Sequence, residues 1–151
     1  MSSDPHSLPS IDFQTLYRGR TVGILRWPQL DAFWSHLKPR AGEGWYVYAV
    51  GEPPPQVPAD ADAVVRFIDE IDALLRREHD HDYCGIVYAD DLDVPRLIKI
   101  FDPNHLGSSC GSSVHPPPPG WVLSLVPPVD LADAMPLANN RRRWWQRLFG
   151  A

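Results

Sequence analysis

The segment DAVVRFIDEIDALLRRE, residues 62–78, decides the fold class together with the two β-type runs that follow it. Its apolar residues recur every three or four positions, which is typical of one buried helix face. These positions are Val64, Phe67, Ile68, Ile71, Leu74 and Leu75. Asp60 or Asp62 can cap the N-terminus of this helix, and Arg76 and Arg77 suit the negative end of its dipole. The segment therefore predicts an amphipathic helix on the surface of a core.

The two runs after this helix predict a β-hairpin. YCGIVYA (residues 83–89) and RLIKIF (residues 96–101) are rich in aromatic and β-branched residues. The six residues between them, DDLDVP, are typical of a hairpin loop.

Further strands and a second helix are expected on both sides of this segment. Residues 21–27, 45–50 and 121–126 read as strands, and residues 28–37 read as a helix that begins near Pro28. The order β-α-β-α-β-β-β predicts an α+β fold: a mostly antiparallel or mixed sheet of about five strands, with two helices packed on one face.

The 151 residues suit one domain with tails. We expect residues 1–12 to be a disordered lead-in, residues 13–130 to form a single α+β domain, and residues 131–151 to form a connector and a C-terminal tail. Residues 1–12 have neither a basic opening nor an apolar stretch, and no apolar run reaches the roughly 18 residues of a membrane span, so a cytoplasmic location is expected.

The charge distribution argues against a general role in nucleic-acid binding. The net charge is −5, and by segment it is −9 over residues 52–93 and +4 over residues 137–151. Phosphate neutralisation needs a basic surface, whereas the body of this protein is acidic. A Gly-rich turn between strand and helix, which would support nucleotide binding, is also missing from the sequence.

Histidine and cysteine residues form one candidate site. The candidate metal ligands are His79, His81, Cys84, His105, Cys110 and His115. If the later loop folds over residues 83–89, two cysteines and two histidines would satisfy the tetrahedral preference of zinc. The cysteines are, however, 26 positions apart and lack the C-x₂₋₄-C spacing of structural zinc sites. The alternative interpretation is that residues 79–82 are a solvent-exposed end of the helix and that Cys84 is a small core residue on a strand.

The same loop carries a candidate for thiol chemistry. Cys110 lies between small residues in Gly107–Gly111, where backbone amides can point at an anion. This loop is the site of the alternative function, a metal- or thiol-dependent enzyme. Asp102 could act as a general base at a strand end, but an Asp before Pro more often forms a turn.

The most distinctive segment is the C-terminal tail. It predicts a short amphipathic helix with apolar and basic sides, made of Arg141, Arg142, Arg143, Trp144, Trp145, Arg147, Leu148 and Phe149. Nine residues alone in water would scarcely stay helical, so the tail must pack on something. The alternatives are its own domain, including the acidic residues 52–93, a weak peripheral contact with a membrane, or a groove on a protein partner.

The leading hypothesis is a small non-catalytic accessory protein that docks a protein partner through this C-terminal helix. Trp and Arg are enriched at the energetic centres of protein interfaces, which supports a docking role for these eight residues. No cofactor is required by this hypothesis, while zinc belongs to the enzyme alternative.

Overall fold

The computed structural model describes residues 11–105, 117–131 and 136–149. Nine main elements follow one another in the order α1 (Phe13–Arg18), β1 (Val22–Arg26), α2 (Trp27–Leu37), β2 (Tyr46–Ala49), α3 (Ala61–Glu78), β3 (Tyr83–Ala89), β4 (Leu97–Ile100), β5 (Trp121–Ser124) and α4 (Asn139–Phe149). Short 3₁₀ turns at Lys38–Arg40 and Pro103–His105 follow α2 and β4.

The five strands form one sheet in the order β1-β3-β4-β5-β2, and each pair of neighbours is antiparallel. The predicted hairpin is β3–β4, with Val87 opposite Ile100. The α+β class, the five strands and the two early helices are therefore confirmed, and the sheet is antiparallel rather than mixed.

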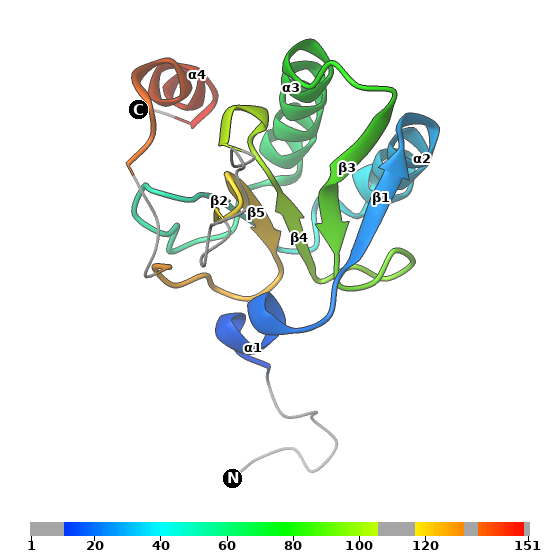
Figure 1. Cartoon of the computed structure of the whole chain (residues 1–151). Helices are drawn as coiled ribbons and strands as arrows, with labels where there is room; N and C mark the ends of the chain where they lie inside the picture. Colours follow the sequence, from blue (N-terminus) through cyan, green and yellow to red (C-terminus); the bar gives the residue numbers. More distant parts are fainter. Residues whose placement is uncertain (1–10, 106–116, 132–135, 150–151) are drawn as a thin grey trace, which may run out of the picture.

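Helices α2 and α3 cover one face of the sheet, which we call the helix face (Figure 1). Asp60 caps α3, as expected, by accepting a hydrogen bond from the Ala63 amide at 2.8 Å. The row of residues on the helix face, in register across the sheet, is Ile24, Val87, Ile100, Trp121 and Ala49. These side chains and the apolar stripes of α2 and α3 form the main core.

The opposite face of the sheet, which we call the α1 face, is only partly covered. Its central row is Gly23, Tyr88, Lys99, Val122 and Tyr48. Phe13 and Leu16 of α1 pack there against Tyr48, Val122 and Leu97 in a second, smaller cluster.

Helix α1 was not predicted from the sequence. It has only six residues, too few for an amphipathic period to stand out, but Asp12 caps it by accepting a hydrogen bond from the Thr15 amide at 2.8 Å. The signal in the sequence that could have predicted this helix is Asp12, a residue that favours the N-cap position, directly before Phe13. Residues 1–10 of the predicted lead-in lie outside the described residues.

Candidate functional site

The C-terminal segment forms the helix α4, which lies beside α3 and packs against α3 and β5 (Figure 1). Trp144 is its buried anchor, with 5% of its surface exposed. The Trp144 ring meets Trp121 of β5 edge to face, with ring centroids 5.5 Å apart, and meets Phe67 of α3 at 6.3 Å. The tail therefore contributes to the main core.

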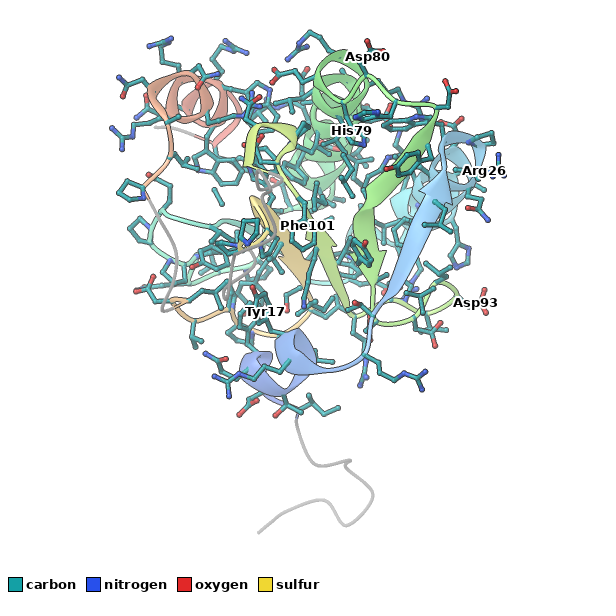
Figure 2. The ribbon with its side chains drawn as sticks, viewed as in Figure 1. Tyr17, Arg26, His79, Asp80, Asp93 and Phe101 are labelled. Atoms are coloured by element: carbon teal, nitrogen blue, oxygen red, sulfur yellow. The ribbon has the colours of Figure 1, made fainter. Side chains whose placement is uncertain are left out.

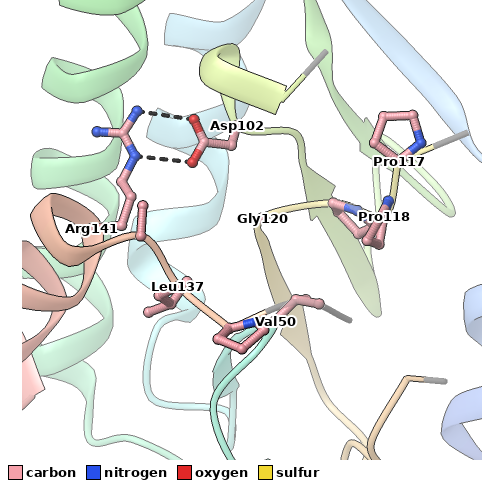
Figure 3. A pocket seen from close by; sticks show the side chains of 10 residues that line it. Val50, Asp102, Pro117, Pro118, Gly120, Leu137 and Arg141 are labelled. Atoms are coloured by element: carbon pink, nitrogen blue, oxygen red, sulfur yellow. Dashed lines mark hydrogen bonds and ion pairs between the residues drawn. The ribbon is translucent and has the colours of Figure 1, made fainter. Parts of the chain in front are cut away.

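Arg141 is the second anchor, and it is bound through ion pairs with Asp102 and Glu78. Its Nε and Nη2 donate to the two carboxylate oxygens of Asp102 at 2.9 Å each (Figure 3). Its Nη1 and Nη2 donate to the two carboxylate oxygens of Glu78 at 3.0 and 2.6 Å. One guanidinium thus joins the end of α3, the loop after β4 and the first turn of α4 in two bidentate pairs.

The electrostatics of this cluster follow from its burial. Burial alone would lower the pKa of Arg141, but the hydrogen bonds that it donates to Asp102 and Glu78 outweigh this effect and raise its pKa above the ordinary value. The same hydrogen bonds from Arg141 lower the pKa of Glu78. Arg141 is therefore a permanent cation between two carboxylates.

The tail contacts the acidic segment of residues 52–93, which was one of the predicted alternatives. Glu78 lies within residues 52–93, and so does Glu52, whose carboxylate is 4.0 Å from Nε of Arg142. Of the eight residues predicted to bind a partner, Arg141 and Trp144 are committed to their own domain. Both side chains are buried and anchor α4, so partner binding stays a prediction that the exposed residues of the helix carry.

The remaining six residues lie on the sides of α4 that are not buried. Arg143 and Arg147 are one helical turn apart and exposed, and neither makes a salt bridge with any described residue. Arg142, Trp145, Leu148 and Phe149 are partly exposed. The Leu148 carbonyl accepts a hydrogen bond from Arg66 of α3, which holds the end of the helix.

An apolar groove runs beside α4. It has a volume of about 300 Å³ and lies between Trp145 and Phe149 on one side and the proline-rich connector of residues 53–59 on the other. Val57 of this connector is 71% exposed. The rings of Trp145 and Phe149 are 4.5 Å apart and both approach Phe67, so that the helical wall of the groove is backed by the core. No local pattern in the sequence indicates that this connector faces the tail.

A second cavity, of about 440 Å³, lies at the N-terminal end of α4 (Figure 3). Its walls are mostly apolar and include Val50, Pro118 and Leu137, while Arg141 and Asp102 form its polar side. Both charged groups are already paired with each other, so they anchor α4 rather than offer free ligands.

Asp102 itself forms the turn that its position before Pro103 indicated. Its Oδ1 accepts a hydrogen bond from the Asn104 amide at 2.9 Å. The sequence missed its pairing with Arg141, because the two residues are 39 positions apart and no local pattern links them.

The three candidate metal ligands that the structure describes do not form a cluster of ligands. The His79 ring is buried, and its Nε2 donates to the backbone carbonyl of Cys84 at 2.9 Å. Cys84 is a buried free thiol whose pKa is raised by burial, while His81 is exposed. Within residues 11–105, 117–131 and 136–149, no three His, Cys, Asp or Glu side chains are placed to share a metal ion.

The other half of that candidate site lies outside the described residues. This applies to Cys110, His115, the loop Gly107–Gly111 and the side chain of His105. The zinc site and the thiol-dependent enzyme therefore stay predictions from sequence alone.

No protein-family model, curated protein or solved structure matches this chain. The fold and the site define its class: an α+β domain with a five-stranded antiparallel sheet and a C-terminal helix anchored by a buried arginine. No helix in the described part of the chain is long and apolar enough to cross a membrane.

Proposed function

We propose that this protein is a non-catalytic interaction protein that binds an acidic segment of a protein partner on α4. The binding site, which we call the α4 docking surface, consists of Arg142, Arg143, Arg147, Trp145 and Phe149 with the adjoining groove. The observation that carries the proposal is that buried and exposed residues of α4 have different contacts. Arg141 and Trp144 attach the helix to the core. Arg143 and Arg147 are exposed to solvent and form no ion pair with any described residue.

Anchoring matters because it lowers the entropic cost of binding. A free peptide of this length would have to become helical on contact with its partner, at the expense of affinity. Here the helix is already formed, and two of its charged side chains stand one turn apart on a rigid support.

The chemistry of the surface specifies the partner. Three arginines favour carboxylates, which they can bind through paired hydrogen bonds. The groove between Trp145 and the connector favours an apolar side chain on the same partner segment. Arg143 and Arg147 lie about 160° around the helix axis from Trp145. An acidic segment that wraps around α4 and places a large apolar residue in the groove therefore fits this surface.

The test is a comparison of two double charge reversals. Arg143→Glu/Arg147→Glu changes the α4 docking surface, whereas Arg18→Glu/Arg20→Glu makes the same change in charge at exposed positions at and just after the end of α1. Both variants should fold with stability within about 0.5 kcal/mol of the unchanged protein, because the substituted side chains are exposed.

Tagged forms of all three proteins would be used to capture partners from a native lysate, with identification by mass spectrometry. We expect a protein with an acidic apolar segment that the unchanged chain and the Arg18→Glu/Arg20→Glu control retain and the α4 variant loses, with weaker capture at high salt. Equal capture by all three would contradict the proposal. Binding of the unchanged chain to anionic phosphatidylglycerol vesicles, with no protein captured, would replace the protein partner with a membrane surface.

A further inference from the structure

The α1 face of the sheet carries a cavity that is separate from the α4 docking surface. Its volume is about 300 Å³, and it is lined by Thr21, Gly85, Tyr88, Lys99, Phe101 and Pro117, none of which belongs to α4 or to the groove beside it. Helix α1 covers the neighbouring part of this face and leaves the cavity open next to Lys99. In Figure 2, Phe101 lies above Tyr17 of α1.

Lys99 brings a positive charge to this cavity and has no carboxylate partner among the described residues. It lies in the middle of the sheet, on β4, opposite Tyr88 of β3 and Val122 of β5. Its ammonium group lies 4.2 Å from the centre of the Tyr17 ring, a cation–π contact. No carboxylate in the described part of the chain lies within salt-bridge distance of it. Burial lowers the pKa of Lys99, because the charged form loses hydration inside the protein.

Aromatic rings form the walls beside this charge. The rings of Tyr88 and Phe101 meet edge to face, with centroids 5.6 Å apart. The Tyr88 ring lies over Gly23, where a Cβ atom would stand only 2.7 Å from it. Gly85, which also lines the cavity, has a φ of +68°, which glycine adopts without strain, and a Cβ atom there would stand 2.9 Å from the Tyr83 ring.

We propose that this cavity binds a small aromatic carboxylate, with the carboxylate on the Lys99 ammonium and the ring against Tyr88 and Phe101. A carboxylate supplies a counter-ion, which Lys99 does not find among the residues that the structure describes, and a planar ring matches the aromatic walls. The volume lies at the lower end of the range for small-molecule sites, which favours a ligand of one or two fused rings. Lys99 is the one cationic side chain that lines the cavity, and a single positive charge favours a monoanion over a phosphate dianion.

The experiment uses 2-naphthoate as the probe and neutral 2-naphthamide as its matched control. Backbone amide shifts of the full-length protein would be followed by NMR during titration with each compound. We expect saturable shifts centred on Gly85, Tyr88 and Phe101 with the acid, and at least about tenfold weaker binding of the amide, which lacks the charge.

A pair of lysine variants tests the position of the charge. The chain has two lysines, and the other one, Lys38, pairs with Asp69 of α3 away from this cavity. Lys99→Met should weaken naphthoate binding about tenfold or more, while Lys38→Met should leave it unchanged.

Three results would overturn the proposal: no saturable shift with naphthoate, equal affinity for the acid and the amide, or full naphthoate affinity in Lys99→Met. If Lys99→Met does not fold, the comparison of acid and amide on the unchanged protein decides. None of these readouts involves α4, so the proposal stands or falls independently of the partner-binding function.

Discussion

The guanidinium of Arg141 is the point at which three segments distant in the sequence meet. It pairs with Glu78 at the end of α3 and with Asp102 after β4, and both carboxylates lie close to the core. A charge in this position stabilises the structure only as long as its partners remain, because each unpaired ion would carry a large desolvation cost.

Removal of Arg141 should therefore destabilise the whole domain. Arg141→Met keeps most of the apolar length of the side chain but leaves two carboxylates facing each other, and we expect a loss of about 3 kcal/mol in the free energy of unfolding. The measurement is urea unfolding followed by circular dichroism. Arg143→Met is the matched control on the same helix, where we expect a change within about 0.5 kcal/mol. Equal effects of the two substitutions would show that the Arg141 cluster contributes no special stability.

His79 makes the stability of the domain depend on pH. Burial is the largest cause that lowers its pKa below the ordinary value of 6.5, and the nearby His81 adds to it. The folded state thus binds a proton at His79 less readily than the unfolded chain does. The contribution of neutral His79 to stability is fully present above pH 6.5 and declines as the pH falls from 6.5 through the lower pKa of the folded state.

The loss of stability between about pH 7.5 and about pH 5.5 should accordingly be larger in the unchanged protein than in His79→Gln. Glutamine can still donate to the Cys84 carbonyl but does not titrate. Urea unfolding at several pH values measures both slopes, and an NMR titration of the His79 ring gives its pKa directly. Identical slopes, or a His79 pKa above 6.5, would refute this expectation.

Helix α4 shows at the scale of an element what an amphipathic pattern can and cannot predict. The spacing of its Trp, Leu and Phe residues predicted a helix, and α4 is a helix over Asn139–Phe149. The pattern treated Trp144 and Trp145 alike, yet only Trp144 is buried. Trp144 is the more buried of the two because it packs against Trp121 and Phe67, which belong to other elements and which the helical pattern cannot locate.

This difference predicts unequal effects for the two tryptophans. Trp144→Ala should cost about 3–5 kcal/mol of unfolding free energy, because it leaves a cavity between α4, Phe67 and Trp121. Trp145→Ala should cost about 1 kcal/mol, since its side chain is partly exposed beside the groove. Thermal and urea unfolding of both variants provide the comparison. A Trp145→Ala variant as unstable as Trp144→Ala would contradict the assignment of these two faces.

At the scale of the whole molecule, the sequence predicted the elements better than their arrangement. Alternation and helical spacing are local signals, and they located β3, β4 and α3 to within a residue or two. The pairing of β2 with β5 joins strands separated by more than seventy positions, and no local signal specifies it. That pairing makes the sheet antiparallel throughout, where the sequence left a mixed sheet open.

Only the local part of the candidate site could be predicted from the sequence, because local patterns do not show which distant residues come together. The charge and aromatic content of residues 141–149 indicated that the tail packs on another surface, and the acidic residues 52–93 were one predicted contact for it. The groove beside Trp145 and the cavity beside Lys99 each combine residues from several elements, so they became visible only in the folded structure.

We propose that α4 belongs to the cooperative core of the domain and thereby presents a preformed docking surface. Native-state hydrogen exchange of the backbone amides of α4 tests it most directly, with the amides of α3 as the internal reference. We predict that the amides around Trp144 and Trp145 exchange only through global unfolding, with the same free energy as the most protected amides of α3. Exchange of the α4 amides at a much lower free energy than those of α3 would contradict the claim, because it would mean that the helix detaches while the rest of the domain stays folded.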